Sequence, residues 1–201
     1  MHELVATFIF FFAVIDPIGT VPVFLAVTRG YDEKVKRKIA IKASLISALI
    51  LLFFLVAGER ILTAINTPLS AFQIAGGIVL FIFALSMIFG DSKPDQEMKL
   101  VSATDVAIFP LAVPSIASPG AMLAAVLLTE NSEYTWVEQS LTAMTMISVL
   151  LIVMVLLLCA SFIHRIIGNS GASIISKVMG LILASVAVNS VLGGITEYFS
   201  L

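Results

Sequence analysis

The sequence predicts an all-α, polytopic membrane protein with six transmembrane helices, arranged as two inverted three-helix repeats whose first helices are broken. Composition is the first reason. Hydrophobic residues fill 60% of the 201 positions and charged residues only 12%, and the mean hydropathy is +1.12, values typical of a chain surrounded by lipid. The second reason is that the apolar runs are continuous, whereas the strands of a membrane barrel alternate apolar with polar residues.

A helix needs about 20 apolar residues to cross roughly 30 Å of hydrocarbon, and six stretches reach that length. We expect spans at residues 4–27, 39–58, 69–90, 105–129, 139–163 and 177–197. The first has no basic segment before it and no cleavage site with a soluble domain after it, so it is interpreted as a retained helix. Polar and turn-forming residues fill the connections, which read RGYDEKVKRK, GERILTAINTP, GDSKPDQEMK, ENSEYTWVEQ and HRIIGNSGAS.

The basic residues fall on one side of these spans. Every Lys and Arg except Arg60 lies in or beside the first, third and fifth connections. Cytoplasmic loops of membrane proteins carry the excess of basic residues. We therefore expect a multi-pass protein of the bacterial inner membrane, embedded in the lipid bilayer, with its N- and C-termini on the periplasmic side.

The chain also contains an internal repeat. Residues 71–90 align with residues 174–193, and the polar residues Ser86 and Asn189 fall at one position. The identical pairs are Gly77 with Gly180, Leu80 with Leu183, Ala84 with Ala187 and Gly90 with Gly193. Residues 15–28 and 117–129 match as well, since each segment has a polar residue, then Pro, then Gly, an apolar run and a closing Thr. Because three spans per half is an odd number, the second half enters from the opposite side. We predict one membrane domain built from two inverted repeats, residues 1–92 and 93–201.

Both first spans carry helix breakers at mid-membrane depth. Proline removes a backbone donor and clashes with the preceding turn, and backbone groups freed in this way must be buried in protein or line a wet cavity. Asp16 and Ser118 are N-cap residue types, each followed by Pro at the first helical position. The free amides of a half-helix suit an anionic or oriented polar solute. Two simple proline kinks are the alternative interpretation.

Asp16 is the only acidic residue in the interior of a span. A carboxylate at that depth costs about 2.5–3.5 kcal/mol on insertion scales, so such a residue is a functional-site candidate by default. We expect it to carry a coupling proton or cation, or only to cap its half-helix. No other cofactor, no metal and no nucleic-acid partner is expected.

The predicted solute-binding residues are those of the two breaks and the polar pair of the third spans. They are Asp16, Pro17, Gly19, Thr20, Pro114, Ser118, Pro119, Gly120, Ser86 and Asn189. The last two are expected to face the bundle. An interhelical hydrogen bond is the simpler role for Ser86, and for Asn189 this role and contact with a solute both stay open.

Five motifs resemble the MarC family of bacterial inner-membrane proteins, within the lysine-exporter superfamily. They cover the chain from end to end in the family's order: DPIGTVPVF, AGER, AGGIVLFIFALSMIF, FPLAVPSIASPGAM and KVMGLILASVAVNSVLGGI. Two positions depart from the family pattern, which has a basic residue where this chain has Ser86 and an Asp where it has Gly193. The resemblance implies export of a small solute such as an amino acid or a metabolite.

We therefore expect a secondary transporter or exporter of a small polar solute, with its site at mid-membrane between the repeats. The sequence has no GxxxxGK[ST] phosphate-binding loop to indicate a primary energy source. A channel, or a structural membrane component without transport, is the alternative. An intramembrane enzyme is least favoured, because the spans hold no His and no second acid opposite Asp16. The oligomeric state stays open and includes a homo-oligomer.

Overall fold

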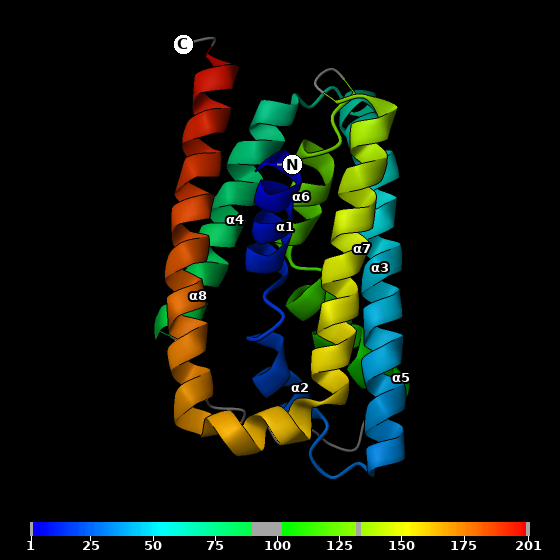
Figure 1. Cartoon of the computed structure of the whole chain (residues 1–201). Helices are drawn as coiled ribbons and strands as arrows, with labels where there is room; N and C mark the ends of the chain where they lie inside the picture. Colours follow the sequence, from blue (N-terminus) through cyan, green and yellow to red (C-terminus); the bar gives the residue numbers. More distant parts are fainter. Residues whose placement is uncertain (1, 90–101, 132–133, 200–201) are drawn as a thin grey trace.

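The computed structural model describes residues 2–89, 102–131 and 134–199, and helices dominate these ranges (Figure 1). The elements are α1 (His2–Ile15), α2 (Thr20–Val27), α3 (Glu33–Ala64), α4 (Leu69–Phe89), α5 (Ala103–Val106), the irregular segment η1 (Ala107–Ile116), α6 (Pro119–Leu127), α7 (Trp136–Leu158) and α8 (Ala160–Tyr198). No strand occurs within the described ranges, and the all-α prediction is confirmed.

All six predicted spans have a counterpart. Five segments are long and apolar enough to cross a membrane, namely Leu4–Val27, Glu33–Ala64, Leu69–Phe89, Trp136–Leu158 and Gly180–Tyr198. The sixth is the pair Ala103–Ile116 and Pro119–Leu127, which is bent by 57° at its break. The two spans that were predicted to be broken are therefore broken, one between α1 and α2 and the other between η1 and α6.

Some predicted boundaries are wrong because hydropathy detects only the apolar part of a helix. α3 begins at Glu33, inside the basic first connection, and ends at Ala64, inside the second. The fifth connection, HRIIGNSGAS, was expected to be a loop but belongs to the 39-residue helix α8. In Figure 1 the first part of α8 crosses the lower end of the molecule, and the helix then turns upward along its side. The third connection, residues 90–99, lies outside the described residues.

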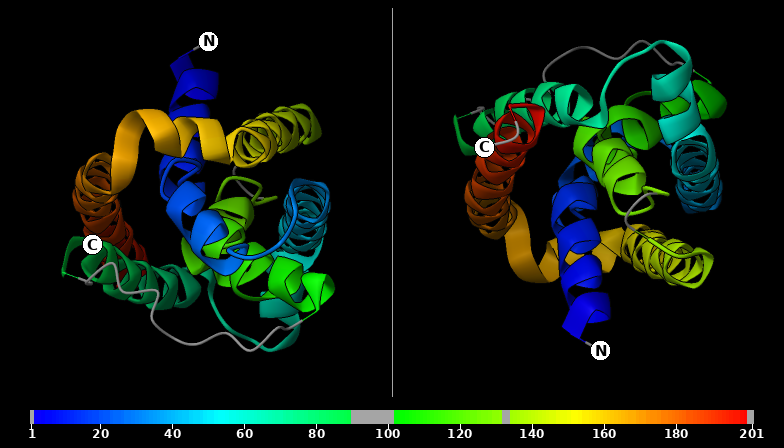
Figure 2. Two further views of the ribbon diagram at one scale, coloured as in Figure 1. Left: turned by 90° about the horizontal axis from the view of Figure 1, so that it is seen from below. Right: turned by 90° about the horizontal axis from the view of Figure 1, so that it is seen from above.

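The two halves of the chain start at opposite ends of the molecule. In Figure 1 the α1–α2 span runs from the upper to the lower end, α3 returns, and α4 runs downward again. The second half then begins near the lower end with α5 and takes the three opposite passes. The C-terminus lies at the upper end, and the N-terminus lies in the upper half of the molecule. Seen along this axis, the two broken spans lie between the α4–α8 pair and the α3–α7 pair (Figure 2).

Helices α4 and α8 pack closely through two glycines. A Cβ added at Gly77 would lie 3.0 Å from the carbonyl oxygen of Ala187, and a Cβ added at Gly180 would lie 3.0 Å from that of Ala84. Small residues let helix backbones approach in this way within a membrane. Because the sequence alignment matches Gly77 with Gly180 and Ala84 with Ala187, each contact is the counterpart of the other.

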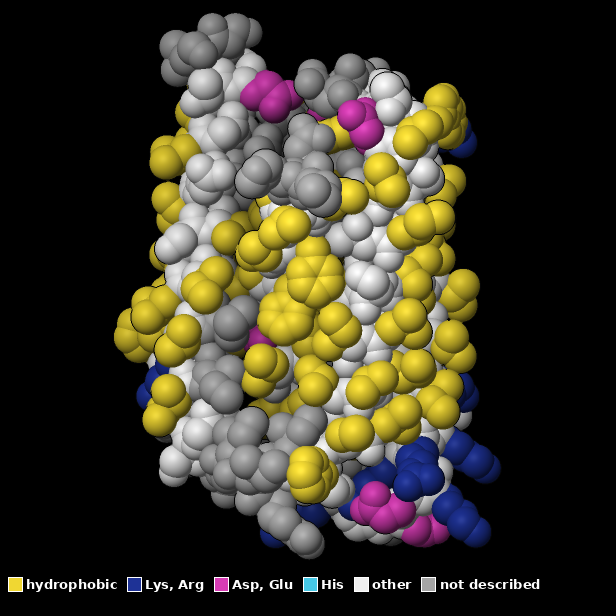
Figure 3. All heavy atoms as spheres, viewed as in Figure 1, with side chains coloured by type: hydrophobic (Ala, Val, Ile, Leu, Met, Phe, Trp, Pro, Cys, Tyr) yellow, Lys and Arg dark blue, Asp and Glu magenta, His cyan; other side chains and the backbone are white. Residues whose placement is uncertain are grey.

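The surface has the distribution of side chains that a membrane protein requires. Hydrophobic side chains cover most of the visible face between its two ends, and Lys and Arg side chains gather at the lower end where α3 begins (Figure 3). Large apolar residues are exposed along the spans, such as Phe53 at 55% and Val56 at 61% on α3. Such a surface is stable in contact with lipid tails and not in water.

Candidate functional site

The first break begins where α1 loses its regular hydrogen bonds. Pro17 has no N–H to donate to the carbonyl of Ala13, one turn back. Asp16 takes the left-handed conformation, with φ of 48°, which Asp tolerates better than most residues. Its own N–H still donates to the carbonyl oxygen of Phe12 at 3.1 Å, and this bond completes the last turn of α1. The chain therefore leaves the helix at the acidic residue.

Asp16 forms hydrogen bonds with residues of the turn that follows it. Its Oδ1 accepts a hydrogen bond from the N–H of Gly19 at 2.9 Å, and the Thr20 hydroxyl donates to the carbonyl oxygen of Asp16 at 3.0 Å. The prediction that Asp16 is the N-cap of the second half-helix, with Pro17 at its first position, is wrong, because α2 begins at Thr20 and its N-cap is Gly19. The carboxylate instead closes the turn of residues 17–19 that joins α1 to α2. A Cβ at Gly19 would collide with the carboxylate of Asp16, so a larger residue here would displace that side chain.

The second break follows an irregular segment. Within η1, Phe109 and Val113 have extended backbone conformations, and each precedes a proline, which disfavours the helical conformation at the residue before it. Helix α6 then starts as predicted. Ser118 is its N-cap, with Pro119 at the first position, and the Ser118 Oγ accepts from the N–H of Ala121 at 3.1 Å.

Side chains from the second break form hydrogen bonds with the first break. The Ser118 hydroxyl donates to the carbonyl oxygen of Val14 at 2.7 Å. In a continuous helix this carbonyl would accept from the N–H of Ile18, so Ser118 replaces a bond that the first break removes. The Ser115 hydroxyl also lies 3.4 Å from that of Thr20. Residues from opposite halves of the chain therefore share one hydrogen-bonded centre.

This centre is buried and contains an acid whose carboxylate accepts one backbone hydrogen bond. Asp16 is 4% exposed, Thr20 is 1% exposed and Ser118 is fully buried. In the part of the chain that the structure describes, no Lys, Arg or His forms an ion pair with Asp16. A carboxylate in such surroundings needs a proton, a cation, water or a solute to offset the loss of hydration.

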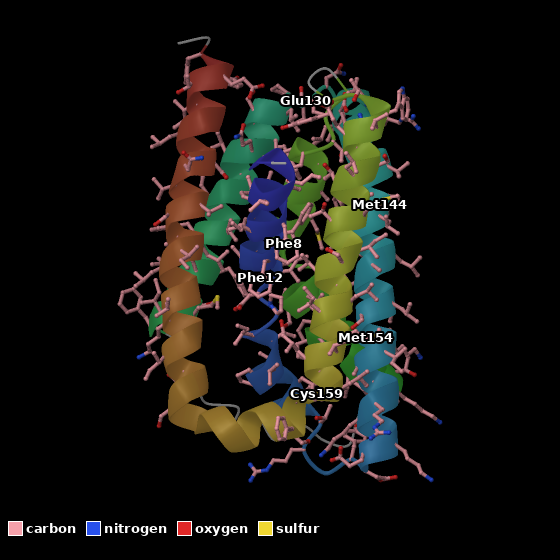
Figure 4. All side chains as sticks on the ribbon, in the orientation of Figure 1. Phe8, Phe12, Glu130, Met144, Met154 and Cys159 are labelled. Atoms are coloured by element: carbon pink, nitrogen blue, oxygen red, sulfur yellow. The ribbon has the colours of Figure 1, made fainter. Side chains whose placement is uncertain are left out.

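Two aromatic rings lie on α1 just before the first break. Phe8 and Phe12 stack with their ring centroids 6.0 Å apart and an interplanar angle of 28°, and Figure 4 shows both on α1 in the middle of the molecule. Both rings pack against the buried core. The polar break thus adjoins an apolar surface on its own helix.

Eight of the ten predicted site residues belong to the breaks, and two do not. Pro17 and Gly120 are buried there, Gly120 directly against Leu80, and Pro114 lies in η1 next to Ser115. The expectation that Ser86 and Asn189 face the bundle is wrong, since both are exposed.

Helix geometry explains the position of this pair. Ser86 lies nine residues after Gly77, as Asn189 does after Gly180, and nine residues make two and a half turns. Because the glycines turn toward the neighbouring helix, the polar residues point away from it. The Ser86 hydroxyl donates to the carbonyl oxygen of Phe83 in its own helix at 2.6 Å.

Sequence reasoning missed two serines on α3 that face the second break. The buried Ser47 hydroxyl lies 2.8 Å from the carbonyl oxygen of Ala43 and 3.3 Å from that of Ala112, in η1. One turn earlier, the Ser44 hydroxyl is buried without a hydrogen-bond partner in the described part of the chain. The spacing of Ser44 and Ser47 could have indicated a shared polar face, because residues three apart lie on one side of a helix. The sequence does not show that this face contacts η1.

Two polar contacts attach α3 to the ends of the broken fourth span. At the upper end, Glu59 Oε2 accepts from the backbone N–H of Asn131 at 2.9 Å and from its side-chain amide at 2.7 Å. At the lower end, Lys42 Nζ donates to the Thr104 hydroxyl at 2.8 Å. These contacts are exposed, so each stabilises the fold only modestly, and they join α3 to both ends of the span that carries Ser118.

Six apolar spans with a shared polar break at mid-depth define a polytopic, all-α integral membrane protein. The family model described as MarC family integral membrane protein matches residues 1–199. The chain belongs to this family.

The chain is similar in sequence to several known proteins along nearly its whole length. A UPF0056 membrane protein of Buchnera aphidicola subsp. Schizaphis graminum is 31% identical over 199 residues, or 99% of each chain. The UPF0056 inner membrane protein YhgN of Escherichia coli strain K12 is 32% identical over 198 residues, and a UPF0056 membrane protein of Methanocaldococcus jannaschii is 34% identical over 200, each alignment covering 97% of both chains. No solved structure matches the chain. These relatives and the apolar helices support a multi-pass inner-membrane protein.

Proposed function

We propose that this protein is a secondary transporter or exporter of a small polar solute, such as an amino acid or a metabolite, and that the solute binds at the two helix breaks. The observation that carries the proposal is the hydrogen bond from Ser118 to the Val14 carbonyl oxygen. It lies beside the buried carboxylate of Asp16, which forms no ion pair with any residue that the structure describes. Irregular backbone at this depth is tolerated where it is buried in protein or lines a polar path.

Residues 1–92 and 93–201 act as inverted repeats that move relative to each other around this site. The reciprocal contacts of Gly77 with Ala187 and of Gly180 with Ala84 support this division, as do the opposite directions of the two halves in Figure 1. Broken helices at the interface of inverted repeats are a common source of binding sites in secondary transporters. Rocking of one repeat against the other then exposes the breaks to each side in turn.

Asp16 is the coupling residue and binds a proton or a cation during the cycle. The solute contacts the free backbone groups of the breaks together with Thr20 and Ser118. The Lys and Arg side chains at the lower end in Figure 3 support a cytoplasmic position for that end, which leaves both termini on the periplasmic side.

The test uses purified protein in liposomes. A thermal-shift screen against amino acids, metabolites and cations first identifies a stabilising solute, because a ligand that binds the folded state raises its stability. Solute-driven counterflow of that compound is then expected. Flux without saturation would favour a channel instead, and no stabilisation or flux with any compound would favour a structural membrane component.

Asp16→Asn tests the coupling role. The substitution keeps the size and polarity of the side chain, so solute exchange and folding are expected to persist while uptake driven by a pH gradient is lost. Asp105→Asn is the matched control, because Asp105 is an exposed acid at the start of the fourth span. A pH-gradient dependence that is equal in Asp16→Asn and the wild-type protein would exclude proton coupling at Asp16.

A further inference from the structure

Asn189 is a polar residue on the outer surface of α8. It lies nine residues from either end of the apolar segment Gly180–Tyr198, or about 13 Å at the helical rise per residue. Its side chain is exposed, and its neighbours Val188 and Leu192 are 46% and 59% exposed. Asn189 therefore lies at the middle of a segment long and apolar enough to span the membrane, among exposed apolar side chains of α8.

The amide of Asn189 has no hydrogen-bond partner in the described part of the chain, and this distinguishes it from other exposed polar residues of the spans. Ser86, Thr145 and Ser185 each donate a hydrogen bond to a carbonyl of their own helix, at 2.6, 2.8 and 3.1 Å. A hydroxyl on a helix can satisfy itself in this way. The Asn189 amide has two donors and an acceptor with nothing to bind, and lipid tails offer it no partner.

A second amide lies beside Gly193, one turn along α8 from Asn189. Gln73 of α4 is half-buried and also lacks a partner in the described ranges. Its Nε2 lies 3.2 Å from the position that a Cβ of Gly193 would take, and Gly193 is one turn along α8 from Asn189. Asn189 and Gly193 are both exposed and, being four residues apart, share one side of α8. We call Asn189 and Gly193, together with the Gln73 amide that contacts α8 at Gly193, the amide face.

We propose that two copies of this chain associate through the amide face, with the Asn189 side chains of the two copies hydrogen-bonded across a two-fold axis. An amide is complementary to itself, because the oxygen of one copy accepts from the NH₂ group of the other. A two-fold axis brings the same residue of both copies together, and amide side chains stabilise helix association in membranes. The exposed Gly193 allows the helices to approach closely. This interface is separate from the solute site proposed above.

Cysteine cross-linking in native membranes tests the contact directly. Cys159 is exposed, so it is first replaced by Ser. In that background, Asn189→Cys is expected to form a disulfide-linked dimer after mild oxidation. Val155→Cys on α7, which is 54% exposed and lies outside the amide face, is the control and is expected to remain monomeric. No cross-link at position 189, or equal cross-linking at both positions, would overturn the proposal.

The oligomeric state in lipid nanodiscs provides a second test. The wild-type protein is expected to be dimeric, and Asn189→Leu is expected to weaken the dimer at least tenfold while its circular dichroism is unchanged. Asn189→Gln, which keeps the amide, should retain the dimer. A monomeric wild-type protein would overturn the proposal. An Asn189→Leu variant that stays dimeric would also overturn the proposal. If that dimeric variant had lost the stabilisation by solute, Asn189 would be assigned to the solute site instead.

Discussion

The hydroxyl of Ser118 lies 2.7 Å from the carbonyl oxygen of Val14, although the two residues are 104 positions apart in the chain. The Ser118 Oγ also accepts a hydrogen bond from the N–H of Ala121 at 3.1 Å. One buried side chain therefore caps the second half-helix and satisfies a carbonyl that the first break leaves without its helical partner. The two halves of the protein are joined at the depth where each loses its helical continuity.

Ser118→Ala is expected to lower the free energy of unfolding by about 2–4 kcal/mol. The substitution removes a helix cap, worth about 1 kcal/mol, and leaves the buried Val14 carbonyl unsatisfied, which costs about 1–3 kcal/mol. Unfolding in a denaturing detergent titration measures the change. Ser86→Ala is the control, because its exposed hydroxyl bonds only its own helix. Equal effects of the two substitutions would contradict the joining role of Ser118.

Gly19→Ala is expected to abolish transport by displacing the Asp16 carboxylate, with which the new Cβ would collide. Overpacking of this kind also destabilises by about 1–3 kcal/mol. The control is a double-mutant cycle on unfolding free energy, because the clash needs both groups. Gly19→Ala should be much less destabilising in an Asp16→Ala background. Strictly additive effects would show that the methyl group disturbs something other than the carboxylate.

Gly77→Val and Gly180→Val are each expected to destabilise the protein, by about 1–3 kcal/mol. Each new side chain would push α4 away from α8, because a Cβ at either position already lies 3.0 Å from a carbonyl oxygen of the partner helix. The repeat relationship predicts losses of similar size. Ala75→Val, at an exposed position of α4, should have little effect. Strongly unequal losses at the two glycines would argue against equivalent packing in the two halves.

The proposed orientation predicts which ends of the helices a membrane-impermeant maleimide reaches in intact cells. In a Cys159→Ser background, Ile65→Cys at the upper end of α3 should be labelled, since Ile65 is 62% exposed. Asp32→Cys, which precedes α3 at the end rich in Lys and Arg, should be labelled only after lysis. The reverse pattern would place the basic end outside and reject the orientation.

The spans and both breaks were predictable because their causes are local. The length of an apolar run specifies a membrane helix, and Pro17 and Pro119 each disfavour continuation of the helix that precedes them. The N-cap role of Ser118 followed from its type and the proline after it. Helices outside the apolar runs were not predictable in this way. The loop expected before the sixth span is part of α8 because helical structure can continue where hydropathy falls.

Sequence alone therefore determined that this is an all-α membrane protein with six spans, a Pro-containing break in the first and fourth, and an acid at the first break. Tertiary structure decided which groups share a site. It brought Ser118 to Val14, placed Ser47 beside Ala112, and turned Ser86 and Asn189 outward. The reason is that helical periodicity fixes which residues share a face, whereas the partner of each face depends on close packing between helices, here set by Gly77 and Gly180.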